Sequence, residues 1–299
     1  MTLDQLRIFV AVAEREHVTR AAGDLALTQS AVSAAVAALE ARHATQLFHR
    51  VGRGIALTEA GRLFLVEARA VLARAAAAEA MLADLAGLAR GHVAVAASQT
   101  VANDWLPPRL VAFRTAHPGV TVSLAIGNTA FVASQVGAGI VELGLVEGEV
   151  DHPLLAVEAV AEDQLVAVAA PGLAGVPDRA LTPDDIRAMR WVARERGSGT
   201  RALFEAMVAA AGLTMADLAI LLELPSNEAV RAAAAAGGGA AVLSRLAVAG
   251  ALAAGTLRAL DLEPPTRRLL ARRFLALRHR ERAPSRAGQA LMATIRGPD

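Results

Sequence analysis

The sequence predicts an N-terminal winged helix-turn-helix, mostly α-helical, then a long linker helix and a two-lobed α/β domain. Three observations support this fold class. Residues 21–62 have the pattern of a helix, a tight turn, a second helix and a hairpin bearing Gly and Arg, an order that places one helix in the DNA major groove. Residues 59–89 repeat apolar side chains at heptad spacing. From residue 91 onward, strand-like and helix-like segments alternate.

The composition is that of a globular protein with two or three domains. The chain has 299 residues, of which 55% are hydrophobic, and it has no Cys, which fits a reducing cytoplasm. The formal net charge is only +1, so a DNA-binding role depends on the placement of Arg rather than on bulk charge. The charged first helix does not resemble a signal peptide, and Gly and polar residues interrupt the uncharged run 119–141, so we expect no membrane span.

Two short helices are expected to form the DNA-reading element. One covers residues 20–25, and Thr28 is expected to cap the next. On that second helix, Val32 and Leu39 share a face and should pack inward. The opposite face should point toward DNA, and it carries the candidate contacts Thr28, Gln29, Ser30 and Ser33. Gln can bond bidentately to adenine, and Ser can reach bases or phosphates.

The segment 47–57 is expected to form a two-stranded wing. Its residues alternate, and Gly52 and Gly54 permit a tight turn. Arg50 and Arg53 flank the turn, where they could meet phosphate or the minor groove. Taken singly, such polar residues are as easily explained as an ordinary solvated surface; their order along the chain favours DNA contact.

The helix expected over 59–89 carries a stripe suited to pairing with another helix. Its members include the candidate dimerisation residues Phe64, Val71, Leu82 and Leu85. A single domain could bury the same stripe internally. The DNA-reading element before it favours a dimer, because such elements usually bind DNA as two-fold pairs.

The remainder of the chain predicts two α/β units in series, each with a parallel sheet covered on both faces by helices, around a cleft. Parallel sheets place ligand sites at the carboxyl ends of strands, and helix N-termini suit anions. Polar residues at such points give candidate ligand contacts: Ser98, Gln99, Thr100, Asn128, Thr129, Ser198 and Thr200. Plain helix capping is the competing explanation. Glu147 and Arg201 could face the same cleft, but a surface role is the simpler expectation.

The stretch TQSAVSAAVAALEARHATQLFHRVGRGIALTEAG resembles the DNA-binding segment of LysR-type transcriptional regulators. The matching positions are residues 29–33, 39–40, 47–50 and 57–61, and the likeness continues through AASQTVANDWLPPRLVAFRTAHPGV and SNEAVRAAAAAGGGAAVLSRLAV. Two positions depart from the family pattern. Ala44 stands where the family commonly has Gly after the recognition helix, and Ala34 and Ala35 stand where polar or basic residues are common.

The resemblance implies three domains. These are a winged helix-turn-helix over residues 1–58, a dimerising linker helix over 59–89, and an effector-binding domain over 90–299, like that of periplasmic binding proteins. Lobe 1 of that domain would comprise about 91–161 and 267–299, and lobe 2 about 162–266. The usual working form of the family is a tetramer.

We therefore expect a cytoplasmic, sequence-specific transcriptional regulator controlled by a small anionic effector. Its expected partners are double-stranded promoter DNA, further copies of itself and a small anionic metabolite, with RNA polymerase as a further option. A solute-binding protein and a small-molecule enzyme on the same scaffold are the alternatives. No catalytic motif and no metal-ligand spacing occurs in the sequence, so we expect no enzyme activity, no metal and no cofactor apart from the effector.

Overall fold

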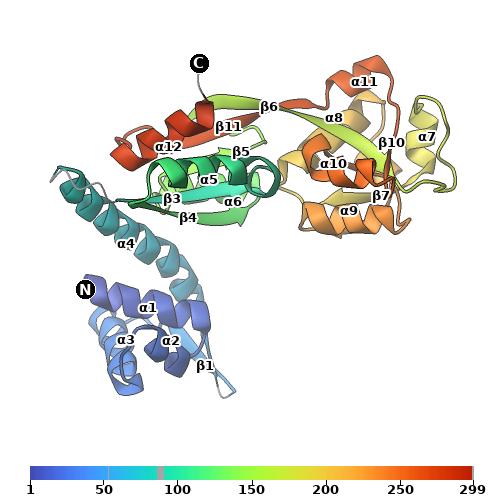
Figure 1. Ribbon diagram of the computed structural model, residues 1–299. Helices are drawn as coiled ribbons and strands as arrows, with labels where there is room; N and C mark the ends of the chain where they lie inside the picture. The colour runs from blue at the N-terminus through green and yellow to red at the C-terminus, as the bar shows by residue number, and fades with distance from the viewer. Residues whose placement is uncertain (53, 86–90, 298–299) are drawn as a thin grey trace. The chain divides into compact units, whose positions relative to one another are not determined.

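The computed structural model describes residues 1–52, 54–85 and 91–297. Contacts within the chain divide it into two compact units. The N-terminal unit holds α1 to α4, and the C-terminal unit holds the strands and helices from β3 to α12 (Figure 1). Each unit is described by itself.

Three short helices open the N-terminal unit: α1 (Leu3–Arg15), α2 (Val18–Asp24) and α3 (Gln29–His43). Thr28 caps α3 as expected, since its side chain accepts a hydrogen bond from the backbone N–H of Ala31. Helix α2 begins two residues before the expected start at residue 20, because the His17 side chain caps it.

A small apolar core holds this unit together. The fully buried Phe9 of α1 lies between Phe48 and Phe64, with ring centroids 5.4 and 4.9 Å away. Val32 and Leu39 of α3 are buried, which confirms the predicted inward face. The opposite face of α3 is consequently free of the core.

The wing is an antiparallel hairpin of β1 (Phe48–Val51) and β2 (Gly54–Leu57). Gly52 has a φ of 59° in the turn, a left-handed conformation that favours Gly. The carboxylate of Glu40 on α3 accepts hydrogen bonds from the backbone N–H groups of Leu47 and Phe48, at 2.7 and 3.0 Å. This contact ties the start of the wing to α3.

Helix α3 ends at Ala44, which is left-handed with φ 47° and ψ 38°. The backbone N–H of Thr45 donates to the carbonyl of Glu40 at 3.1 Å, and that of Ala44 donates to the carbonyl of Ala41 at 3.3 Å. These two bonds form a Schellman motif. An alanine therefore occupies the left-handed position that glycine usually takes.

Helix α4 (Glu59–Leu85) follows the wing. It confirms a long helix from residue 59, whereas residues 86–89 of the predicted helix lie outside the described residues. Phe64, Leu65 and Leu72 on its first half pack against the core of the unit.

The C-terminal unit is built on a mixed sheet with the path β10–β6–β11–β5–β3–β4, on which β9 also pairs with β6. Its strands are β3 (Gly91–Ser98), β4 (Val120–Gly127), β5 (Leu143–Val146), β6 (Leu155–Ala169), β9 (Ala241–Ser244), β10 (Arg258–Ala259) and β11 (Ala271–His279). Strand β3 is parallel to β4 and β5. A separate parallel pair is formed by β7 (Arg190–Arg194) and β8 (Ala219–Leu224).

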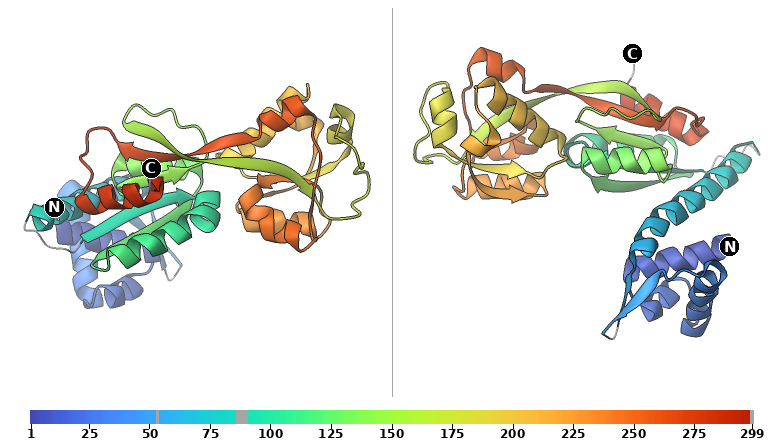
Figure 2. Two further views of the ribbon diagram at one scale, coloured as in Figure 1. Left: turned by 45° about the horizontal axis from the view of Figure 1, so that its top comes forward. Right: turned by 180° about the vertical axis from the view of Figure 1, so that it is seen from behind.

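The prediction of purely parallel sheets is wrong. β9 and β10 are both antiparallel to β6, and the longest antiparallel pair joins β6 and β11. These two strands pair antiparallel over Leu155–Gln164 and Ala271–His279, and β11 is also antiparallel to β5. They run side by side from one lobe to the other (Figures 1 and 2). The chain enters the second lobe along β6 and returns along β11, so the two strands must point in opposite directions.

Helices cover both lobes. The first lobe has η1 (Val101–Trp105), α5 (Leu106–Ala116), α6 (Thr129–Ala138) and α12 (Arg286–Arg296), with Trp105, Phe113 and Phe274 in its core. The second lobe has Trp191 and Phe204 in its core. Its helices are α7 (Pro183–Ala188), α8 (Gly199–Ala210), η2 (Met215–Asp217), α9 (Asn227–Ala235), α10 (Arg245–Ala253) and α11 (Pro264–Arg268). The element η1 is a π-helical turn, so the single helix expected around 100–116 is divided into two elements.

Within the three described ranges, no single helix is long and apolar enough to cross a membrane. The bent pair of α2 and α3 passes that test by length and composition alone.

Candidate functional sites

The predicted DNA-reading face of α3 is exposed. Gln29, Ser30 and Ser33 are all exposed, whereas Val32 and Leu39 of the same helix are buried. The hydroxyl of Thr28 is used locally, because it caps the helix and lies 3.1 Å from the hydroxyl of Ser30. The geometry leaves the other three side chains able to meet a base edge.

The wing presents one of its two predicted Arg residues. Arg50 is exposed on β1, next to the turn at Gly52. Arg53 lies outside the described residues.

The predicted dimerisation stripe on α4 has two parts. Phe64 packs against Phe9 inside the unit. Val71 and Leu82 are 41% and 69% exposed, and the side chain of Leu85 lies outside what the structure describes. Leu63 and Val66 are also exposed on this helix, although the heptad pattern does not include them.

In the C-terminal unit, the residues expected at the carboxyl ends of strands come together from both lobes. Thr100 follows β3, Thr129 begins α6 after β4, and Ser198 and Thr200 lie at the start of α8. A Cβ added to Gly199 would lie 2.8 Å from the backbone of Gly148, so the two lobes touch here through glycine backbones. The predicted cleft residues therefore face one another across a narrow seam.

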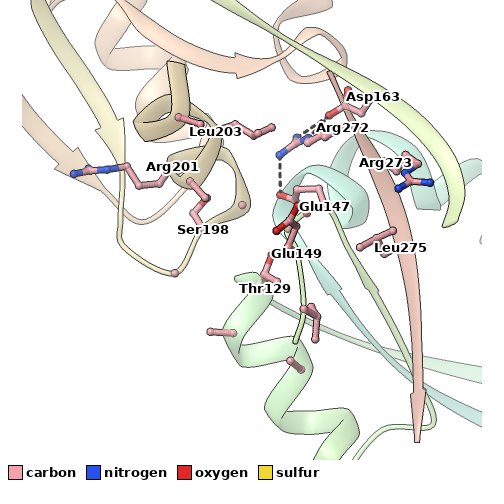
Figure 3. A pocket seen from close by; sticks show the side chains of 18 of the residues that line it. Thr129, Glu147, Glu149, Asp163, Ser198, Arg201, Leu203, Arg272, Arg273 and Leu275 are labelled. Atoms are coloured by element: carbon pink, nitrogen blue, oxygen red, sulfur yellow. Dashed lines mark hydrogen bonds and ion pairs between the residues drawn. The ribbon is translucent and has the colours of Figure 1, made fainter. Parts of the chain in front are cut away.

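Arg272 of β11 connects the two sets of hydroxyls. Its guanidinium donates to Thr200 Oγ1 at 3.2 Å, to Thr100 Oγ1 at 3.3 Å and to Asp163 Oδ2 at 2.7 Å. Glu147 Oε1 lies 3.8 Å from the same guanidinium (Figure 3). Sequence reasoning missed Arg272 and Asp163, because their pairing depends on the antiparallel register of β6 and β11.

The side-chain amide of Gln99 forms hydrogen bonds between the two lobes. Its Nε2 atom donates to the carbonyl of Pro225 at 2.8 Å, and its Oε1 atom accepts from the backbone N–H of Asn227 at 3.1 Å. Asn227 in turn donates to Thr100 Oγ1 at 2.9 Å. Asn128 caps α6 by accepting from the N–H of Phe131 at 2.9 Å. Effector contact by Gln99 or Asn128 stays a prediction.

Other predicted residues carry buried polar atoms with no hydrogen-bond partner among the described residues. These atoms are the hydroxyls of Ser98, Thr129 and Ser198 and the Oε2 atom of Glu147. Buried polar groups are nearly always satisfied, so unpaired atoms indicate a place for a bound molecule or water. Thr129, Glu147 and Ser198 belong to the lining of one cavity, and Ser98 does not. A cavity of about 1400 Å³ is lined by Thr129, Glu147 and Ser198 among others (Figure 3).

The expectation of surface roles for Glu147 and Arg201 is wrong. Glu147 is 5% exposed and lies in the wall of the cavity. Arg201 is 6% exposed, and its guanidinium is held by Glu205 and Glu223 at 2.7 and 3.0 Å. Neither burial is readable from the local sequence, because both depend on how α8 and the β5 loop pack.

Burial raises the pKa of Glu147, while the nearby Arg272 guanidinium and the hydrogen bond from Thr100 act in the opposite direction. The site thus combines hydroxyl donors, the guanidinium of Arg272 and the buried carboxyl groups of Glu147 and Asp163. The lining of the cavity also includes Arg196, Arg201 and Arg273. In the described part of the chain, no group of three or more His, Asp or Glu side chains could hold a metal ion.

Two family models match the chain. The bacterial regulatory helix-turn-helix protein model of the LysR family matches residues 3–62, and the LysR substrate binding domain model matches residues 86–297. Together they cover both units.

Curated relatives match along most of the chain. The HTH-type transcriptional regulator YeiE of Escherichia coli (strain K12) is 34% identical over 289 residues, which is 96% of this chain and 94% of the relative. The RuBisCO operon transcriptional regulator of Allochromatium vinosum is 33% identical over 271 residues, or 90% and 84% of the two chains. These relatives are regulators, which does not favour the solute-binding and enzyme alternatives.

Solved structures share the fold. Full-length CbnR in complex with its target DNA has a TM-score of 0.72 at 24% identity, covering 99% of both chains. The regulatory domain of CcmR from Synechocystis PCC6803, in complex with 2-PG, has a TM-score of 0.62 at 23% identity, covering 69% of this chain and 96% of that one.

The exposed helix face beside a wing and the polar cavity between two α/β lobes thus occur in a chain that both family models match, and the chain belongs to the LysR family of DNA-binding transcriptional regulators, which are not enzymes and carry an effector-binding domain.

Proposed function

We propose that this regulator reads promoter DNA with α3 and the wing, and that a small anionic effector bound in the C-terminal unit controls it. The division of labour follows the predicted domains: residues 1–58 bind DNA, residues 59–89 dimerise, and residues 90–299 bind the effector, in lobes of about 91–161 with 267–299 and about 162–266. The observation that carries the effector proposal is that the unpaired buried polar atoms of Thr129, Glu147 and Ser198 belong to residues lining one cavity between the lobes.

The DNA contacts proposed are those of the exposed α3 face and the wing. Gln29, Ser30 and Ser33 read base edges or phosphates, and Arg50 and Arg53 meet phosphate or the minor groove. Thr28 positions the helix by capping it. The DNA complex of CbnR, which shares the fold, supports this role for the N-terminal unit.

Two copies are proposed to pair through α4, and two dimers to form a homotetramer. The exposed Val71 and Leu82 supply apolar contact surface, together with Leu85, while Phe64 supports the helix from inside the unit. Dimerisation places two α3 helices in successive major grooves, and the tetramer engages two such sites in the cytoplasm. RNA polymerase is a further partner of such an assembly.

The effector is proposed to bind at Ser98, Thr129 and Ser198, near Thr100 and Thr200. The N-terminus of α8 supplies unpaired backbone N–H groups and the positive end of a helix dipole, which suit an anion. Arg272, whose charge is offset by Asp163, places N–H donors beside these hydroxyls. The binding of 2-PG by the CcmR domain supports a small ligand in this fold. The effector acts only if it binds one shape of the assembly more tightly than another.

DNA binding is tested with the full chain and the DNA upstream of its own gene, by fluorescence anisotropy at several salt concentrations. We expect Gln29→Ala to weaken binding to this DNA by about 1–3 kcal/mol. We expect Arg50→Ala to lower the slope of log affinity against log salt by about one unit. Arg187→Ala removes the same charge from an exposed position in the C-terminal unit and should change neither. Equal affinities for all three variants and the wild type would refute the proposed contacts.

Effector binding is tested by thermal shift against a panel of small anionic metabolites. A ligand of the proposed site should stabilise the wild type and lose that effect in Thr129→Ala and Ser198→Ala, which delete unpaired hydroxyls. Stabilisation that survives in both variants would place the ligand elsewhere.

A further inference from the structure

Glu147 is the one carboxyl group among the unpaired buried atoms of the effector site, and it lies directly after β5. The side chain is 5% exposed, and its Oε2 atom has no partner among the described residues. Its Oε1 atom accepts a hydrogen bond from Thr100 Oγ1 at 3.2 Å. One oxygen is therefore fixed and the other is available to a bound molecule.

The two cations that act electrostatically on Glu147, Arg272 and Arg194, are held by other acceptors. Arg272 donates to Asp163 at 2.7 Å but lies 3.8 Å from Glu147, beyond hydrogen-bond distance. Arg194 donates to both carboxylate oxygens of Glu195, at 2.8 and 2.9 Å, and also to Asn227. Asp163 offsets the charge of Arg272, and its own negative charge acts to raise the pKa of Glu147. The ionised Glu147 would thus be an excess negative charge in a buried site.

An acceptor-only anion in this site would meet two opposed requirements. The hydroxyls of Thr129 and Ser198 and the start of α8 offer donors, which suit oxyanion acceptors. The free oxygen of an ionised Glu147 would instead repel such a group and leave both partners without a proton between them. Burial raises the pKa of Glu147, while the charge of Arg272, the hydrogen bond from Thr100 and the charge of Arg194 act in the opposite direction.

We propose that Glu147 is the specificity-determining residue of the effector site, and that it selects an oxyanion head group carrying its own O–H donor over an acceptor-only oxyanion. The proposal rests on the effector site proposed above. Monohydrogen phosphate and phosphate monoanions are of the selected class, because one O–H can donate to Glu147 Oε2 while other oxygens accept from the hydroxyls. Sulfate has the same tetrahedral shape but no proton, and it belongs to the rejected class.

The test is isothermal titration calorimetry of the full-length chain with inorganic phosphate and with sodium sulfate, at equal ionic strength. At about pH 8, inorganic phosphate still carries a proton and sulfate carries none. We expect the wild type to bind phosphate about tenfold to a hundredfold more tightly than sulfate, the effect of one hydrogen bond to a charged group.

Glu147→Gln should reduce that preference at least tenfold, because the amide can keep accepting from Thr100 while its N–H₂ group donates to sulfate. Glu263→Gln is the matched control. It makes the same change on an exposed residue of the same unit that does not line the cavity, and it should keep the wild-type preference.

An unchanged preference in Glu147→Gln, or an equal loss in Glu263→Gln, would overturn the proposal. So would failure of both anions to bind the wild type. If Glu147→Gln does not fold, the wild-type ratio decides, and a ratio near one or in favour of sulfate refutes the selection. The proposed function has its own test: a metabolite whose binding requires Ser198, without any phosphate preference, would leave the effector site standing and remove only the role of Glu147.

Discussion

The left-handed alanine at the end of α3 leads to a quantitative prediction. Ala44 has φ 47° and ψ 38°, and the Schellman hydrogen bonds of the turn hold it there. A non-glycine residue in this region costs about 1–2 kcal/mol. Replacement by Gly removes that strain but adds about 0.4–1 kcal/mol of entropy to the unfolded chain. Ala44→Gly should therefore stabilise α3 by roughly 0.5–1 kcal/mol.

Hydrogen exchange of the α3 amides, followed by mass spectrometry on the full chain, measures this effect where it occurs. A gain of roughly 0.5–1 kcal/mol slows exchange about two- to fivefold when local opening governs it. Both Trp residues, Trp105 and Trp191, lie in the C-terminal unit, so their fluorescence reports whether that unit stays unchanged.

Ala38→Gly provides the matched control for the same helix. Ala38 is exposed and lies inside α3, so glycine there should cost about 1 kcal/mol and speed exchange about fivefold. Exchange in Ala44→Gly that is as fast as or faster than in the wild type would refute the strain argument.

Three further changes test the packing of the two units. Glu40→Ala removes the acceptor of two backbone N–H groups at the start of the wing, and chemical denaturation should show a loss of about 1–3 kcal/mol in the N-terminal unit; an unchanged unfolding midpoint would mean that water replaces the carboxylate. Gly199→Ala puts a Cβ 2.8 Å from the backbone of the facing lobe, so small-angle scattering should show a wider C-terminal unit and the affinity for the effector should fall. In the control Gly250→Ala, the added Cβ meets no atom within 4 Å, so neither quantity should change. The Arg179 guanidinium holds the pKa of Asp185 well below its usual range. The ionised carboxylate therefore stabilises the fold above the unfolded-state pKa, near 4, and this stability is lost as the pH falls through the folded-state pKa. Asp185→Asn should flatten the dependence of the melting temperature on pH below about 4, and parallel curves for the variant and the wild type would contradict this.

Much of the N-terminal unit follows from local sequence. The inward face of α3, the cap at Thr28 and the glycine turn of the wing depend on periodicity and turn chemistry within a few residues. The sequence places the start of α2 two residues too late because His17, a less common N-cap than Ser or Thr, caps this helix. Local signals of this kind are insensitive to the rest of the fold.

Only part of the C-terminal site could be predicted from the sequence. Hydroxyls at strand ends could be found from the alternation of strands and helices, since the rule for parallel sheets applies to β3, β4 and β7. Arg272 and Asp163 could not, because 109 residues separate them and only the antiparallel register joins them. The contact between Gly148 and Gly199 likewise requires the two lobes to be placed before it can be recognised.

The position of β11 in the sheet has a consequence for the order in which the protein is made. β11 lies between β5 and β6 in space but follows the whole second lobe in sequence. A ribosome therefore delivers a complete DNA-reading unit early, while the first lobe waits with a gap in its sheet until β11 emerges. Chains whose synthesis stops within the second lobe are expected to bind DNA without a complete effector-binding domain. Such truncated chains would compete with the full-length protein for the same promoter sites.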